Sequence, residues 1–163
     1  MLRKALLVAP LLLIAGCGGS SSVASRPANT AFSTDLTSIF KDIKSYGSGA
    51  VTVGWNQLTG TTTLNGSNAT VELQATVNYR NGSGQFDGLV TVTLPDTSAM
   101  TLLMKGTASL NSSTSTTSFV SNLTWLGGSG SLASANANGS FTGSRSTALG
   151  GAVHLDVKLQ MNP

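Results

Sequence analysis

The chain has 163 residues, and its nine Lys and Arg residues against six Asp and Glu residues give a formal net charge of +3. Charged residues make up only 9% of the sequence, so hydroxyl and amide side chains must supply much of its solubility. The length suits one compact domain, and the sparse charge provides no basic stripe along which nucleic acid could bind, which excludes nucleic acid as a partner.

Residues 1–16 have the layout of a secretory signal peptide. Arg3 and Lys4 form a positively charged N-terminal region, and an apolar run over residues 5–14 follows, interrupted only by Pro10. This run is too short for a permanent transmembrane helix. Removal of Arg3 and Lys4 with the signal would leave seven basic residues against six acidic ones, a net charge of about +1.

The signal ends at the only cysteine of the chain, Cys17. The sequence Ile14-Ala15-Gly16-Cys17 resembles a bacterial lipobox, and this resemblance implies cleavage before Cys17 and covalent lipid on its thiol, with no other cofactor expected. Two or three acyl chains anchor a protein stably, since each buried CH₂ contributes about 0.8 kcal/mol. The alternative is an ordinary signal peptide with a coincidental cysteine.

Residues 17–30 are rich in Gly and Ser and are expected to form a flexible tether behind the lipid. Residue 18 is Gly rather than the Asp that retains such lipoproteins in the inner membrane. By the same resemblance, we expect a lipid-anchored location at the outer membrane. Both the surface-exposed and the periplasmic face remain open.

Residues 31–47 are predicted to form an amphipathic helix that packs against or plugs the following domain. Five apolar residues recur at spacings that place them on one helical face: Phe32, Leu36, Ile39, Phe40 and Ile43. Gly47 could end this helix in the left-handed conformation. A partner-binding or membrane-lying helix is the alternative, but such a helix should carry more Lys and Arg on its polar face.

From Ser48 the apolar residues alternate with polar ones, which is typical of antiparallel strands with one buried and one wet face. About eight strands are expected, beginning near residues 48, 59, 69, 84, 98, 115, 129 and 151. Asn-Gly turns, as at Asn65-Gly66 and Asn81-Gly82, are strong hairpin signals. We therefore predict an all-β domain over residues 48–163, an up-and-down β-barrel with its apolar faces inward, with a two-sheet sandwich as the alternative.

The stretch SANANGSFTGSRSTALGGAVHLDV resembles the closing motif of the transferrin-binding protein B-like β-barrels. The motif residues are Gly139, Phe141, Gly143, Gly150 and Gly151. The runs VNYRNGSGQFDGLVTVTL and MKGTASLNSS resemble earlier strands of that family, so the likeness covers roughly residues 69–161. The sequence departs from the family pattern at Thr142, Ser144 and Ala148, and the resemblance therefore concerns the fold more than the ligand.

The resemblance implies a surface lipoprotein that binds a host protein, such as transferrin or factor H, or carries haem. We expect a non-catalytic binding module for a host or environmental protein or a haem-like ligand. The alternative is a structural or assembly lipoprotein that partners another outer-membrane protein. No enzyme, metal or catalytic site is expected, because the lone His154 has no second ligand nearby in sequence and should be a solvated residue of the last strand. Trp55 and Trp125 are expected in the core, and would be binding hot spots if exposed.

Overall fold

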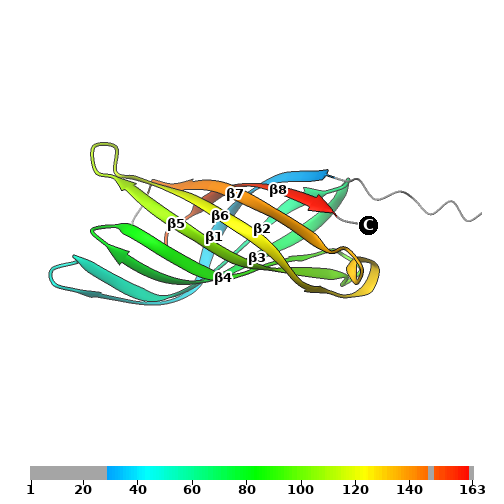
Figure 1. Cartoon of the computed structure of the whole chain (residues 1–163), viewed down its shortest axis with the longest axis horizontal. Helices are drawn as coiled ribbons and strands as arrows, with labels where there is room; N and C mark the ends of the chain where they lie inside the picture. The colour runs from blue at the N-terminus through cyan, green and yellow to red at the C-terminus, as the bar shows by residue number, and fades with distance from the viewer. Residues whose placement is uncertain (1–28, 147–148, 162–163) are drawn as a thin grey trace, which may run out of the picture.

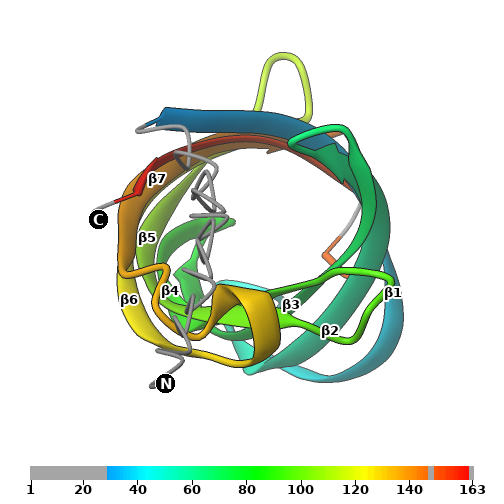
Figure 2. The ribbon, with the colours of Figure 1, turned by 90° about the vertical axis from the view of Figure 1, so that its right-hand side faces the viewer.

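Eight antiparallel strands run up and down in chain order and close into a barrel (Figure 1, Figure 2). The computed structural model describes residues 29–146 and 149–161. The strands are β1 (Asn29–Tyr46), β2 (Val51–Leu64), β3 (Ser67–Arg80), β4 (Ser83–Thr93), β5 (Ala99–Asn111), β6 (Thr116–Gly128), β7 (Ala137–Arg145) and β8 (Val153–Met161), with a 3₁₀ turn η1 (Gly130–Leu132) before β7. Since β8 pairs with β1, the predicted closed barrel is confirmed and the sandwich is not formed.

The helix predicted over residues 31–47 is wrong, because these residues form most of strand β1. The buried positions in the first half of this strand alternate, at Thr30, Phe32, Thr34 and Leu36. Because two of them are threonines, the sequence does not show an apolar residue at every second position. A β-bulge between Ser38 and Phe40 then shifts the phase of the alternation. The combination of a two-residue period and an extra residue produced spacings of three and four that resemble a helix.

Two further strand boundaries differ from the prediction. The strands expected near residues 48 and 59 are one strand, β2, and the strand expected near residue 129 begins only at Ala137. The apparent break in β2 is Gly60, where a Cβ atom would lie 2.3 Å from the carbonyl oxygen of Asp35 on β1. The barrel therefore begins at Asn29 rather than at residue 48, and the predicted signal peptide and Cys17 lie outside the described residues.

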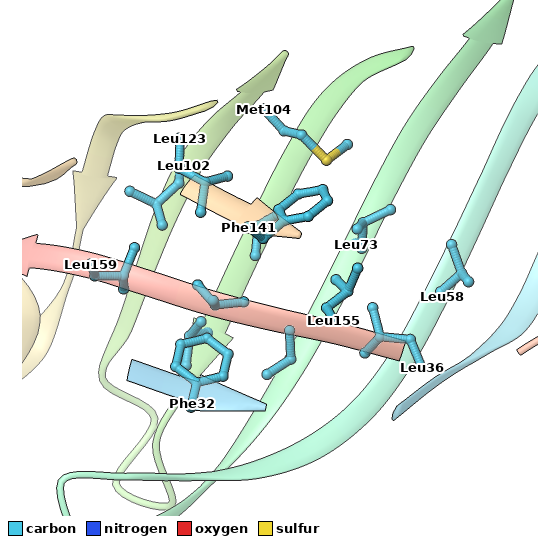
Figure 3. Close-up of a cluster of buried hydrophobic side chains, with 14 of the residues drawn as sticks. Phe32, Leu36, Leu58, Leu73, Leu102, Met104, Leu123, Phe141, Leu155 and Leu159 are labelled. Carbon is cyan, nitrogen blue, oxygen red and sulfur yellow. The ribbon is translucent and has the colours of Figure 1, made fainter. Parts of the chain in front are cut away.

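The apolar side chains fill the interior of the barrel, as predicted from the alternation (Figure 3). The residues of the cluster that are labelled in that view are Phe32, Leu36, Leu58, Leu73, Leu102, Met104, Leu123, Phe141, Leu155 and Leu159. Full burial of one such side chain contributes roughly 1.5–3 kcal/mol. Small residues make room for large ones: a Cβ on Gly106 would lie 2.4 Å from the ring of Phe86. None of the described residues forms a helix long and apolar enough to cross a membrane.

The two ends of the barrel differ. The first residue of β1 pairs with Gln160 near the end of β8, so the described chain begins and ends at one rim, on the right in Figure 1. The β1–β2, β3–β4 and β5–β6 turns lie at the other rim, on the left in that view. We call this second rim the distal rim, because it lies farthest from the point where the tether would join.

Candidate functional site

The residues singled out by the closing motif are structural positions. Phe141 is buried in the core on β7, where its ring stacks on Phe86 with centroids 6.1 Å apart. Gly139 and Gly143 lie on the same strand, and a Cβ at either would collide with a backbone carbonyl oxygen of β8, at 2.0 and 2.4 Å. Gly150 and Gly151 lie in the β7–β8 connection. Gly139 and Gly143 therefore allow the close packing of β7 against β8.

In the distal half of the β1–β2 hairpin the large apolar side chains face outward, whereas in the rest of the barrel they mostly face inward. Trp55 pairs across the sheet with Asp42 and Thr76, both exposed, so it lies on the outer face. Its neighbour Asn56 is 5% exposed and faces inward. The prediction that Trp55 is a core residue is therefore wrong, whereas Trp125 is half-buried and packs against the core as expected.

This outward orientation places an apolar surface on the outside of the distal rim. Phe40 and Tyr46 are 54% and 56% exposed. The ring of Phe40 lies 5.3 Å from that of Trp55, measured between centroids. We define the outer aromatic patch as the residues that share this outer face, namely Phe40, Tyr46, Val51, Val53 and Trp55. Clustered exposed apolar side chains of this kind mark interaction sites more often than scattered ones do.

Charged side chains border the outer aromatic patch. On β1, Asp42 and Lys44 occupy outer positions between the two aromatic residues, opposite Trp55 and Val53. On β3, Arg80 pairs with Val51 and is exposed. Two cationic side chains and one carboxylate give this border a net positive charge, which favours a partner surface with acidic residues around an apolar centre.

Beside the patch, one edge of β1 pairs with none of the described strands. The β1–β8 ladder stops at Leu36, whereas the β1–β2 ladder continues to Tyr46. Within residues 29–146 and 149–161, no strand pairs with the second edge of Thr37–Tyr46. An unpaired strand edge presents backbone donors and acceptors that an extended segment of another chain can bind.

A narrow cavity enters the barrel interior at the distal rim. Its empty space is about 440 Å³ when the part open to solvent is included, but the centres of water molecules can occupy only about 40 Å³ of it. Most of the lining is apolar, and the polar side chains in it are Asn56, Tyr79 and Arg145. Because the smaller volume has room for only a few waters, this interior as it stands does not accommodate a haem macrocycle.

Arg145 is buried at the end of β7, at 7% exposure. Its Nη2 atom donates to Thr117 Oγ1 at 3.4 Å, and its guanidinium carbon lies 5.4 Å from the centroid of the Phe119 ring. Burial lowers the pKa of this guanidinium, and the nearby Tyr79 partly offsets that effect. Burial also raises the pKa of Tyr79 to about 12, which Arg145 partly opposes.

The strand pair that closes the barrel carries a polar cluster on its outer face. His154 Nδ1 lies 2.7 Å from an Asp35 carboxylate oxygen, and its Nε2 lies 3.5 Å from Asp156. Ser33 donates to Asp156 at 2.5 Å. His154 is exposed on β8, as predicted, and among the described residues no group of three His, Cys, Asp or Glu side chains could hold a metal ion.

Replacing His154 with Gln is expected to flatten the pH dependence of stability above about pH 6.5. The hydrogen bond that the His154 ring donates to Asp35, with smaller effects of both carboxylates, raises the pKa of His154 above its ordinary value. The stabilisation is therefore complete below the unfolded-state pKa and is lost as the pH rises through the folded-state pKa. Urea unfolding of both proteins across this range measures the difference, which should stay below about 1 kcal/mol for so exposed a pair. Identical pH profiles would contradict this assignment.

The comparisons with known proteins place the chain in no family. No family model matches it. A search of the curated proteins finds no match either. The features that bear on function are therefore the geometry of the distal rim and the sequence of residues 1–30.

Proposed function

We propose that this chain is a lipid-anchored, non-catalytic binding lipoprotein of the outer membrane, and that the outer aromatic patch is its docking surface for a partner protein. The observation that carries this proposal is the β1–β2 hairpin, which gathers aromatic side chains on the outer face of the distal rim. The lipobox-like residues before Cys17 support the anchor. Because Asn29 lies at the opposite rim, a tether attached there would leave the patch facing away from the membrane.

The chemistry of the patch favours a protein as the partner. Trp and Tyr are enriched among residues that dominate protein–protein binding, where they bury much apolar area at little entropic cost. Lys44 and Arg80 at the border favour acidic residues on the partner, and the open edge of β1 offers backbone hydrogen bonds to an extended segment. A haem-like ligand is the weaker proposal, because the interior cavity is too narrow for a macrocycle.

The resemblance to the transferrin-binding protein B-like barrels supports a host or environmental protein as that partner. In this proposal the barrel is the scaffold, and specificity resides in the distal rim rather than in the closing motif. The second candidate is a structural or assembly lipoprotein whose patch binds another outer-membrane protein. The same exposed edge and patch support it, since both features also suit a permanent envelope partner.

Protease treatment of intact cells separates the two candidates, with lysed cells as the control. Digestion of the mature domain on intact cells would place it at the cell surface and support capture of a host or environmental protein. Protection until lysis would place it in the periplasm and support the assembly role. A second arm treats the Cys17→Ala variant in the same way, so that loss of the anchor is distinguished from the side on which the domain lies.

A further inference from the structure

The cavity inside the distal rim is separate from the outer aromatic patch, because its walls are inward-facing residues and the patch residues are not among them. We propose that this cavity binds a short unbranched aliphatic carboxylic acid, with the carboxylate on Arg145 and the alkyl chain between the phenylalanine rings. The site would act independently of protein docking. Its test therefore does not depend on the proposed function.

Arg145 has the chemistry of a carboxylate site. Its guanidinium is a planar fork of N–H donors that matches the two oxygens of a carboxylate, and charge-assisted hydrogen bonds of this kind are about twice as strong as neutral ones. It is the only buried charged side chain within residues 29–146 and 149–161. Its position at the last residue of β7 places it near the mouth of the cavity, where a ligand would enter from solvent.

Tyr79 supplies a second donor in the same wall. It lies on β3, one residue before the strand ends, and it is 3% exposed. With its pKa raised to about 12 by burial, the phenol keeps its proton throughout the physiological range. A protonated phenol donates to a carboxylate, whereas a phenolate would repel it. The polar side chains of the cavity thus favour an anion.

The rest of the wall favours a thin apolar tail. Three rings meet there: Phe86 lies edge-on to Phe119 at 5.9 Å and stacked on Phe141 at 6.1 Å between centroids. Leu149, Val153 and Leu155 complete the apolar side. The cavity has room for only a few water molecules, so its size favours a slim ligand. An unbranched alkyl chain is the slimmest apolar group available, whereas a sugar or a fused ring system is wider.

Titration calorimetry of the mature wild-type protein with hexanoate and hexanol tests the charge directly. The two probes share a chain length and differ in the head group, so we expect hexanoate to bind at least about tenfold more tightly. Acetate and butyrate should bind progressively more weakly than hexanoate, because they bury fewer methylene groups. Equal affinity for the acid and the alcohol, or no saturable binding of any of the three acids, would overturn the proposal.

Variants locate the site. Arg145→Gln should lose the preference for hexanoate over hexanol, while Arg80→Gln, an exposed position at the same rim, should keep it. Phe40→Ser should also keep it, because Phe40 belongs to the outer patch. Thermal unfolding checks that each variant is folded. If Arg145→Gln is not folded, the affinities of the wild-type protein for hexanoate and hexanol decide whether a carboxylate is preferred. Hexanoate binding that survives Arg145→Gln but is lost in Phe40→Ser would contradict the proposal.

Discussion

Replacing Gly88 with Ala is expected to destabilise the barrel by about 3 kcal/mol or more, a large share of the stability of a domain this size. Gly88 lies on β4 with φ at +155°, a conformation that residues with a side chain rarely adopt. A Cβ atom there would lie 1.8 Å from the carbonyl oxygen of Gln74 and 3.0 Å from the Cα of Ala75. Because both obstacles are backbone atoms of the paired strand β3, relief requires the ladder to open. Urea unfolding followed by circular dichroism measures the loss.

The matched control is Gly127→Ala. Gly127 lies on β6 outside the positive-φ region, and a Cβ atom there would have nothing within 4 Å. This change should leave stability within about 0.5 kcal/mol of the wild type. The strand register of β3 and β4 would be in doubt if Gly88→Ala unfolded at the same urea concentration as the control.

Replacing Cys17 with Ala is expected to move the protein from the membrane fraction to the soluble fraction and to abolish incorporation of labelled palmitate. The reason is that the proposed anchor is covalent lipid on this one thiol, and no other cysteine is present to replace it. An acyl chain contributes about 0.8 kcal/mol per buried CH₂, so its removal eliminates most of the affinity for a bilayer. Cell fractionation with label detection measures both effects.

Ser21→Ala is the control for the Cys17 experiment, since it changes the tether and leaves the lipobox-like residues intact. It should remain in the membrane fraction and keep its label. If the Cys17→Ala protein instead incorporated palmitate, or sedimented with membranes as the wild type does, the lipoprotein assignment would be wrong.

The strand order and the turns were predictable from the sequence because they depend on local chemistry. Asn65-Gly66 and Asn81-Gly82 form the expected tight turns, and all four residues have positive φ. The apolar alternation of β3 and β8 matches their burial residue by residue. The predicted count of about eight strands is correct only because two errors cancel: the prediction divides β2 into two strands and gives β1 as a helix.

The candidate site was not predictable in the same way. Alternation predicts two faces but does not tell which one points inward, so Trp55 was assigned to the core although it lies outside. Only the three-dimensional arrangement shows that the distal hairpin extends past the β1–β8 ladder, where the outer face can be the apolar one. The burial of Arg145 was not predictable from the sequence either. In a Gly- and Ser-rich stretch it resembles an ordinary surface residue, and only the closure of the barrel buries it.

The most direct test of the docking surface is photo-crosslinking on intact cells in a medium that contains the proteins of their natural environment. A photoreactive benzoylphenylalanine replaces Tyr46 in the outer aromatic patch, or Val120 on β6 as the control, and these positions are equally exposed at 56% and 57%. If the outer aromatic patch is the docking surface, Tyr46 yields one discrete protein adduct on irradiation and Val120 yields none. An adduct from Val120 with none from Tyr46, or no adduct at all from Tyr46, would contradict it.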